Sequence, residues 1–329
     1  MPGAMTDQSS VDRAQALLAK GDRAGAVAVG EAAVERNDAD AMFMVAIWRL
    51  IGAPLPRDLA AARRLLASAR QSGHPDAAMM EVALTANGTG APADWATARA
   101  LLEQAAPQDD MAARHLAIVQ TMDLLANGMP RTVPDGEPLS RTPRVAIHRD
   151  AFTPEECAHL AQAIADIITP SVVVDPATGR QVQHPIRNSD GAVIGPTRES
   201  LAVTAINHRI AAMTGIAVNQ GEPLQVLRYA PGQQYRLHSD ALPGAANQRI
   251  ATAIIYLNEG FAGGETTFPD LGIRVVPRGG DMLVFDNVLP DGRPDPRMRH
   301  AGLPVTQGVK WIATRWIRAQ PYDPWTAGN

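Results

Sequence analysis

Apolar and polar positions in the first third of the chain follow the spacing of amphipathic helices. Residues 11 to about 125 are rich in Ala, Leu, Met and Arg, which favour helices, and short breaks with Gly, Pro or Asp interrupt the pattern. The pattern also repeats, because runs that begin at Asp22, Asp58 and Asp94 recur every 36 residues. A repeat of this length is typical of stacked helix pairs, so we expect residues 1–126 to form a short all-α solenoid.

Each of the three repeated Asp residues predicts the start of a helix. A side-chain oxygen at this position accepts a hydrogen bond from a free amide of the first turn. Partner helices are expected to begin near Asp40, Asp76 and Asp110, at nearly the same interval. Small and medium apolar residues follow each Asp in register, which lets each helix pack closely against the one before it.

The pattern changes after residue 126. Residues 127–144 are crowded with Pro, Gly, Thr and Asp, which predicts a linker. Next, Thr153-Pro154-Glu155-Glu156 combines an N-cap, a proline at the first helical position and a capping-box glutamate, so we expect a helix that runs to about Ile168. A second helix is predicted from Glu199 to Thr214.

Short apolar runs separated by turn residues follow the second helix and predict strands. The runs are Leu224–Ala230, Ile250–Leu257, Thr266–Phe268, Ile273–Val276, Met282–Phe285 and Lys310–Ile317. Many short strands at this spacing are typical of an antiparallel sandwich or jelly roll. We therefore expect a second domain over residues 145–320, a double-stranded β-helix (jelly roll) with the two helices packed on one outer face. The chain as a whole is predicted to be α+β.

Net charge, cysteine count and the length of apolar runs limit the partners and the location that we expect for this protein. A formal net charge of −4, a pI near 6.1 and the lack of a Lys and Arg cluster give no reason to expect a nucleic-acid partner. The single cysteine, Cys157, excludes an intramolecular disulfide and a thiolate metal cluster, and we expect it inside a helix as a small apolar residue. Met1–Ser10 lack the features of a signal peptide, and no apolar run approaches the roughly 20 residues that span a bilayer. We expect no membrane partner and a cytoplasmic location.

A candidate metal site follows from three residues of the second domain. His238 and Asp240 lie two positions apart in an extended segment, so their side chains point the same way. His300, expected near the start of the last strand, is the candidate third ligand. Two imidazoles and one carboxylate leave three positions of an octahedron free, an arrangement used by iron(II) oxygenases.

A second His-X-Asp triplet shows that the pattern alone is not specific. His148-Arg149-Asp150 precedes the capped helix and lacks further candidate ligands downstream. It also spells the catalytic triplet of protein kinases, but no glycine-rich phosphate loop or Asp-Phe-Gly follows at a suitable spacing. We interpret it as a strand or turn at the domain edge.

The residues around His238 resemble the prolyl 4-hydroxylase family of 2-oxoglutarate-dependent oxygenases. The resemblance is colinear from about residue 145 to residue 318 and includes the following segments: Gln225–Tyr229, Pro231–Gln233, Tyr235, His238, Asp240, Arg249–Thr252, Tyr256–Leu257, Gly263–Pro269, Gly279–Phe285, His300–Val305, Gly308–Trp311 and Trp316–Arg318. This order of segments carries the family assignment, which the isolated triplet does not.

The resemblance implies roles for the candidate site residues. His238, Asp240 and His300 would hold the iron and form the catalytic centre. Lys310, ten residues beyond the distal histidine, would bind the far carboxylate of 2-oxoglutarate, and a buried dicarboxylate does require a cation at that end. The hydroxyls of Thr266 and Tyr229 match positions that hydrogen-bond the same carboxylate.

The resemblance also implies substrate contacts, at Tyr235, Arg249 and Trp316. Alternate residues of the last strand are expected to face one cavity because they share parity. These residues are Lys310, Ile312, Thr314, Trp316 and Arg318. Tyr235 and Trp316 are equally compatible with a place in the core as ordinary aromatic residues.

The implied reaction is hydroxylation of an unactivated C–H bond, with a prolyl residue in a protein or peptide as the leading substrate. The resemblance implies iron(II), 2-oxoglutarate and O2, oxidative decarboxylation to succinate and CO2, and ascorbate as reductant. Two segments depart from the family: Arg187-Asn188-Ser189 stands where relatives often have Arg-Thr-Ser, and Ala241–Asn247 is a short loop of small residues. Both shape the opening for the substrate, so the target need not be a collagen-like proline.

Other functions stay open. The enzyme could hydroxylate a free amino acid or small metabolite, or the helical repeats could be a binding module attached to an iron- and oxygen-sensing domain. Gly88–Asp94 with Ala98, Ala105 and Ala106 resembles Sel1-type repeats, relatives of tetratricopeptide arrays that usually bind proteins. The repeats would then either recruit the protein substrate or serve as a scaffold, and the pattern assigns no oligomeric state.

Overall fold

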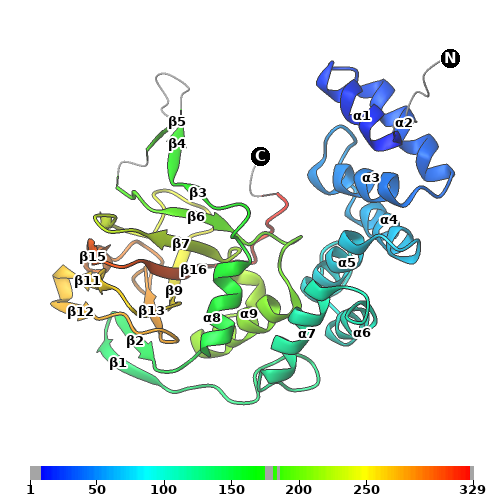
Figure 1. Ribbon diagram of the computed structural model, residues 1–329. Coiled ribbons are helices and arrows are strands. Elements are labelled where there is room, and N and C mark those ends of the chain that lie inside the picture. The colour runs from blue at the N-terminus through cyan, green and yellow to red at the C-terminus, as the bar shows by residue number, and fades with distance from the viewer. Residues whose placement is uncertain (1–8, 175–180, 184–185, 327–329) are drawn as a thin grey trace. The chain divides into compact units, whose positions relative to one another are not determined.

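The computed structural model describes residues 9–174, 181–183 and 186–326 (Figure 1). The chain divides into two compact units. The helical unit comprises Met1–Met122 with Pro196–Thr204, and the sheet unit comprises Asp123–Gly195 with Ala205–Asn329. Within the described residues, every helix is too short or too polar to span a membrane.

The helical unit contains helices that follow one another along the chain. They are α1 (Ser10–Ala19), α2 (Arg23–Glu35), α3 (Ala39–Ile51), α4 (Leu59–Gln71), α5 (Pro75–Asn87), α6 (Trp95–Ala105) and α7 (Asp110–Thr121). Each helix packs against the next one in sequence, which confirms the predicted helical repeat.

The 36-residue period has a physical basis in helix capping and close packing. Asp22, Asp58 and Asp94 each accept a hydrogen bond from the amide three residues later, at 2.8, 2.8 and 3.0 Å. The predicted capping role of these residues is thus confirmed. Four residues beyond each cap, an alanine is fully buried, and its small side chain lets neighbouring helices approach closely. These alanines are Ala26, Ala62 and Ala98.

The sheet unit is built from antiparallel strand pairs throughout its described part. Its strands are β1 (Gly136–Arg141), β2 (Arg144–His148), β3 (Thr169–Pro170), β4 (Val172–Val174), β5 (Gln181–Gln183), β6 (Asp190–Val193), β7 (Gln225–Tyr229), β8 (Tyr235–His238), β9 (Arg249–Tyr256), β10 (Ala262–Gly263), β11 (Thr266–Phe268), β12 (Ile273–Val275), β13 (Met282–Asp286), β14 (His300–Gly302), β15 (Val305–Gln307) and β16 (Lys310–Arg318). Short 3-10 helices lie at Val218–Gln220, Pro269–Leu271 and Pro296–Met298.

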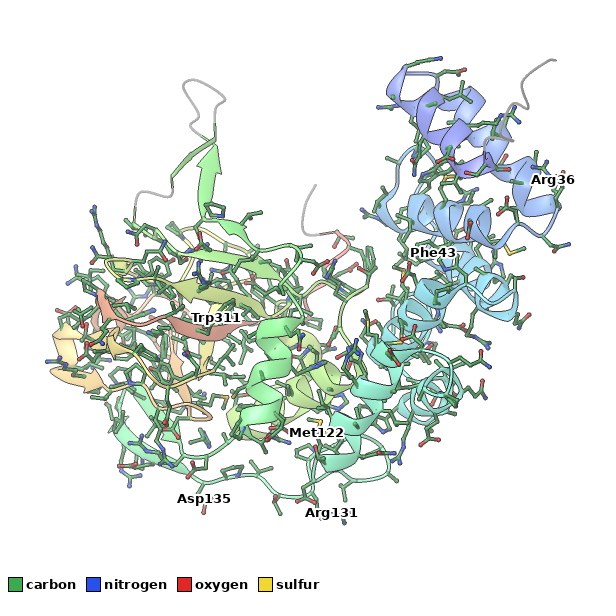
Figure 2. The ribbon with its side chains drawn as sticks, viewed as in Figure 1. Arg36, Phe43, Met122, Arg131, Asp135 and Trp311 are labelled. Atoms are coloured by element: carbon green, nitrogen blue, oxygen red, sulfur yellow. The ribbon has the colours of Figure 1, made fainter. Side chains whose placement is uncertain are left out.

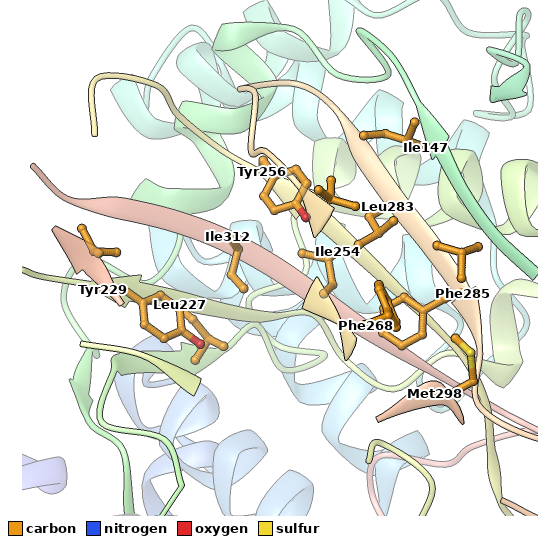
Figure 3. Close-up of a cluster of buried hydrophobic side chains, with 13 residues drawn as sticks. Ile147, Leu227, Tyr229, Ile254, Tyr256, Phe268, Leu283, Phe285, Met298 and Ile312 are labelled. Carbon is orange, nitrogen blue, oxygen red and sulfur yellow. The ribbon is translucent and has the colours of Figure 1, made fainter. Parts of the chain in front are cut away.

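Two sheets enclose the core of this unit. The larger has the order β1-β2-β13-β9-β16-β7-β6-β3, and the smaller has the order β12-β11-β14-β8. Phe268 from the small sheet meets Phe285 from the large sheet edge to face, with ring centroids 5.0 Å apart (Figure 3). The predicted α+β fold with a jelly roll is confirmed.

Two helices, α8 (Pro154–Gln162) and α9 (Leu201–Thr214), lie beside each other on the large sheet (Figure 1). A buried ion pair between Glu156 and Arg209 joins them at 2.7 Å. Cys157 donates to the carbonyl of Tyr256 on β9, and Arg315 on β16 donates to the carbonyl of Asn207 on α9. Both helices therefore cover the same outer face of the sheet, as predicted.

The first of these helices has the expected start and an earlier end. Thr153 and Glu156 form the predicted capping box. The helix ends at Gln162 instead of near Ile168, because the backbone then changes to single turns, in which Ala165 and Ile167 donate to carbonyls three residues earlier. Cys157 is buried in it as expected, and burial raises the pKa of its thiol to about 12, which makes it a poor nucleophile.

The segment expected to be a linker, residues 127–144, contains a strand. β1 pairs with β2 at the edge of the large sheet. Most of its side chains are exposed, so its polar composition gave no signal of a strand. This part of the linker prediction is wrong, because an edge strand can be polar on both faces.

Candidate active site

Strand pairing brings the three predicted metal ligands together. His238 ends β8 and His300 begins β14, and the two histidines are direct partners in the antiparallel register. Asp240 follows β8 by two residues. Ligand atoms of all three side chains lie within 4.8 Å of one another. His300 therefore lies in a strand of its own and not near the start of the last strand, β16, as the sequence had suggested.

Backbone carbonyls fix the orientation of both imidazoles. Nδ1 of His238 donates to the carbonyl of Arg236 at 2.8 Å, and Nδ1 of His300 donates to the carbonyl of Met298 at 3.0 Å. A carbonyl can only accept, so the proton is on Nδ1 and the lone pair is on Nε2. Each Nε2 lies 3.6 Å from an oxygen of Asp240. Both imidazoles therefore present a lone pair toward the same point as the carboxylate.

A buried hydrogen-bond relay holds the carboxylate of Asp240. The hydroxyl of Thr252 on β9 donates to Oδ2 of Asp240 at 2.7 Å. The amide of Asn287 donates in turn to the Thr252 hydroxyl at 2.9 Å. Since Thr252 accepts from Asn287, its own proton is committed to Asp240. Partners of this kind orient metal ligands.

The electrostatic environments of Asp240 and His300 suit a divalent metal. Burial opposes ionisation of Asp240, but His300, His238 and Thr252 outweigh it and hold the pKa of the carboxyl well below its ordinary value. Burial lowers the pKa of His300 to about 4, so its imidazole is neutral at pH 7. Two imidazoles with one carboxylate fit iron(II) and leave coordination positions open.

The second triplet of the sequence lies apart from this site. His148 ends β2, and its Nδ1 donates to the carbonyl of Pro134 at 2.8 Å. Arg149 and Asp150 form the following turn. The interpretation of this triplet as a strand end and turn is confirmed.

A narrow cavity extends from the three ligands between the two sheets. Its wall contains the cosubstrate residues expected from the sequence and also apolar side chains that exclude water. The lining residues used below are Tyr229, Tyr235, Thr266, Lys310, Ile312 and Trp316. Four of the five alternate residues of β16 line it, as their parity predicted.

Arg318 is the exception. A register irregularity between Ile317 and Arg318 turns its side chain away from the cavity. Arg318 instead binds Glu222 and the carbonyl of Asn247, each at 2.6 Å. The expectation that Arg318 faces the cavity is therefore wrong.

Lys310 places a buried cation in the cavity wall. The residue is 4% exposed, and its ammonium donates to the carbonyl of Gly264 at 2.6 Å. No carboxylate among the described residues forms an ion pair with it. Burial lowers the pKa of Lys310 to about 8, with nearby Glu265 acting in the opposite direction. A buried ammonium without a counter-ion favours an anionic ligand.

The neighbours of Lys310 supply hydroxyl groups. Tyr229 is its cross-strand partner on β7, and the Lys310 ammonium lies 5.7 Å from the Tyr229 ring. Thr266 accepts a hydrogen bond from the hydroxyl of Tyr256 at 2.9 Å, so the proton of Thr266 can point into the cavity. Tyr256 belongs to a segment of the family resemblance, but no role in the site was predicted for it, because its contact with Thr266 depends on how the two sheets pack. Gly264 is required here, since a Cβ would lie 2.9 Å from Cδ of Lys310.

The three expected substrate residues occupy different surroundings. Tyr235 stacks on His238, with centroids 3.5 Å apart, and the guanidinium of Arg187 lies 5.4 Å from its ring centroid. Trp316 lines the cavity, and the guanidinium of Arg249 lies 3.9 Å from its ring centroid. Arg249 is outside the cavity wall.

Glu222 holds the guanidinium of Arg249 with two hydrogen bonds of 2.6 and 2.9 Å. The pairing of Glu222 with Arg249 could not be predicted from the sequence, because the two residues are far apart along the chain. No motif marks Glu222 as a member of the site.

Comparisons with known proteins agree with this arrangement. The model of the 2OG-Fe(II) oxygenase superfamily matches residues 224–318. Prolyl 4-hydroxylase 1 of Arabidopsis thaliana is 36% identical over 201 residues, which cover 55% of this chain and 71% of the relative. Probable prolyl 4-hydroxylase 4 of the same plant is 34% identical over 211 residues, covering 56% and 70%.

Solved structures resemble the two parts of the chain separately. A viral collagen prolyl hydroxylase from Paramecium Bursaria Chlorella virus-1 is 28% identical, covers 54% of this chain and 96% of its own, and has a TM-score of 0.42. A Sel1 repeat protein from Oxalobacter formigenes is 20% identical, covers 33% and 85%, and has a TM-score of 0.31.

The jelly roll, together with the candidate metal ligands His238, Asp240 and His300, defines an oxygenase dependent on iron(II) and 2-oxoglutarate. Within that class, the chain belongs to the prolyl 4-hydroxylase family.

Proposed function

We propose that this protein hydroxylates a prolyl residue in a protein or peptide and couples this reaction to decarboxylation of 2-oxoglutarate to succinate and CO2. The observation that carries the cosubstrate assignment is the buried Lys310 ammonium, which shares a cavity with His238, Asp240 and His300. A dicarboxylate with a keto group at one end can chelate the metal with that end and pair with the Lys310 ammonium through its other carboxylate. The prolyl assignment is supported by relatives named prolyl 4-hydroxylases.

In this proposal the three ligands hold iron(II), and the remaining wall of the cavity binds 2-oxoglutarate. Lys310 pairs with the far carboxylate, and the hydroxyls of Thr266 and Tyr229 donate to it. Bound iron supplies the redox chemistry by which O2 and the keto acid oxidise a C–H bond. The apolar side chain of Ile312 helps keep bulk water away from the reacting groups. Ascorbate is proposed as the reductant.

Trp316 and Tyr235 are proposed to orient the substrate beside the metal. Nε1 of Trp316 is buried and has no hydrogen-bond partner among the described residues, so it can donate to a peptide carbonyl. Arg249 is proposed to position Trp316 without contacting the substrate, because Glu222 holds its guanidinium against the face of the Trp316 ring. Tyr235, stacked on His238, forms an aromatic wall that suits a compact apolar proline ring.

The test is anaerobic reconstitution with iron(II) and 2-oxoglutarate, followed by addition of air with a panel of proline-containing peptides or free L-proline. We expect succinate to form in proportion to a peptide product that has gained one oxygen atom, located on proline by mass spectrometry. Product from free proline but not from peptides would assign a small-molecule hydroxylase instead. Lack of both succinate formation and keto-acid binding would refute the oxygenase function itself.

A further inference from the structure

A groove on the helical unit has no part in the proposed oxygenase chemistry. It has a volume of about 480 Å³ and is formed by α1, α3 and the start of α5. Met44 and Trp48 are buried at its floor, while Val11, Phe43 and Ile47 remain partly exposed along it. Phe43 belongs to α3 and is labelled in Figure 2. Apolar side chains gathered in a groove favour an apolar ligand group, since contact removes their surface from water.

Two acidic residues lie at the rim of this groove, and His74 lies beside one of them. Asp40 and Asp76 lie in the first turns of α3 and α5 and are exposed, and the side chain of Asp40 is 76% accessible. No Lys or Arg lines the groove, and within the described ranges neither carboxylate forms an ion pair with one. Some exposed acidic groups elsewhere do have such partners, for example Asp123 with Arg131 at 3.1 Å.

One wall of the groove is held in a fixed position. The ring of His74 stacks on Phe43 with centroids 4.4 Å apart, and its Nδ1 accepts from the amide of Ala77 at 3.3 Å. Nε2 of the same ring lies 3.6 Å from Asp40. The aromatic pair and the nearby carboxylate therefore keep a constant spacing, which a specific ligand requires.

We propose that this groove docks a segment of a partner protein in which an apolar side chain lies next to Lys or Arg. The apolar side chain occupies the floor over Trp48, and the cation reaches the rim at Asp40 and Asp76. Charge complementarity selects this occupant over an acidic or a purely apolar segment, because neither of those brings a Lys or Arg to the two carboxylates. This groove is remote in sequence from the metal ligands, and docking there is independent of the oxygenase reaction.

The experiment measures fluorescence anisotropy of labelled peptides on the full-length chain. The probes are a peptide of alternating Leu and Lys, a matched peptide with Glu in place of Lys, and one with Ser in place of Leu. The Leu–Lys peptide is expected to bind at least about tenfold more tightly than either of the others, and more weakly at high salt. Equal binding of all three probes, or binding of none, would overturn the proposal.

A matched set of variants locates the binding site. Asp40→Asn with Asp76→Asn should weaken binding of the Leu–Lys peptide about tenfold. Asp110→Asn, a change at the equivalent first-turn position of α7 outside the groove, should leave it unchanged, and so should His238→Ala. An equal loss in Asp110→Asn would indicate non-specific attraction and refute the site. Self-association that requires Asp40 would identify a second copy of the chain as the occupant and would also refute it.

Discussion

The two units of this protein bury their apolar side chains through different kinds of contact: local in sequence in the helical unit, and distant in sequence in the sheet unit. In the helical unit each helix packs on its neighbour in sequence, and the repeat is marked by Asp22, Asp58 and Asp94 at the start of a helix. In the sheet unit the central strand β16 pairs with β7 and β9, which lie far back along the chain. Local contacts make the first unit modular, whereas distant contacts make the second cooperative.

This difference decides where chemistry can be assembled. His238 and His300 meet only because β8 and β14 pair, so the site forms only when the sheet has folded. A change in the sheet unit is therefore expected to alter chemistry and binding. A change in the helical unit is expected to alter local stability and leave the chemistry intact.

The largest effect is expected for His238→Ala, which removes one imidazole of the donor set. Turnover of 2-oxoglutarate should fall by at least about a thousandfold, because the metal is lost together with the reaction. Iron content and succinate formation measure this loss. The matched variant His148→Ala removes the histidine of the other triplet and should retain both; equal loss in the two variants would contradict the assignment of the metal site.

Lys310→Met is expected to have the next largest effect. Removing a charged hydrogen bond should weaken 2-oxoglutarate binding by about 1.5–3 kcal/mol, roughly 10- to 150-fold in Kd. Titration of the metal-loaded protein under anaerobic conditions measures this affinity. Unchanged affinity would place the far carboxylate elsewhere.

The pH dependence of the same interaction gives an independent check. Burial lowers the pKa of Lys310 to about 8, so in the ligand-free protein the ammonium loses its proton as pH rises through that value. The charged form binds the carboxylate, and affinity should therefore fall by up to about tenfold per pH unit above this pKa. Lys310→Arg, which stays charged, should flatten the profile; a profile still falling in that variant would assign the titration to another group.

Thr252→Val probes the relay behind Asp240. The variant keeps the shape of the side chain but loses the hydrogen bond to the carboxylate, so metal affinity should fall about 10- to 100-fold. Competition with a chelator of known affinity measures this change without any need for turnover. Thr252→Ser keeps the hydroxyl and should restore most of the affinity; equal loss in both variants would show that the methyl group matters and not the hydrogen bond.

The smallest effect is expected in the helical unit. Asp58→Ala removes the cap of α4 and should destabilise the unit by about 1 kcal/mol. Urea unfolding measured by circular dichroism follows this change, while succinate formation should be unaffected. Asp110→Ala, which removes a first-turn residue that is not the cap of α7, should destabilise less; a loss of activity in Asp58→Ala would show that the two units are coupled.

The same contrast explains which features could be predicted from the sequence. Repeats and caps are local, so the helical solenoid and its three Asp caps followed directly from the spacing of residues. Strands buried on both faces, such as β9 and β16, stood out as apolar runs. β1 did not, because its exposed side chains resemble those of a loop.

The site residues that lie within short sequence motifs could be predicted. His238 and Asp240 share one segment, and the family resemblance linked them to His300 and Lys310. Thr252, Tyr256 and Glu222 take part through cross-strand or inter-sheet contacts, which depend on register, so their roles could not be assigned from a single sequence. Arg318 was wrongly predicted to face the cavity because side chains stop alternating between the two faces of a strand where its register is irregular.

Strand β16 has one further consequence for any study of this protein. Its two faces carry incompatible chemistry, with Lys310 and Trp316 toward the cavity and Arg315 toward α9. A slip of one residue would exchange these faces, place the guanidinium of Arg315 in the cavity and remove from it the ammonium that we propose binds the keto acid. A molecule with the wrong register is thus automatically inactive. The number of 2-oxoglutarate sites per chain can therefore serve as a direct count of correctly folded molecules in a preparation.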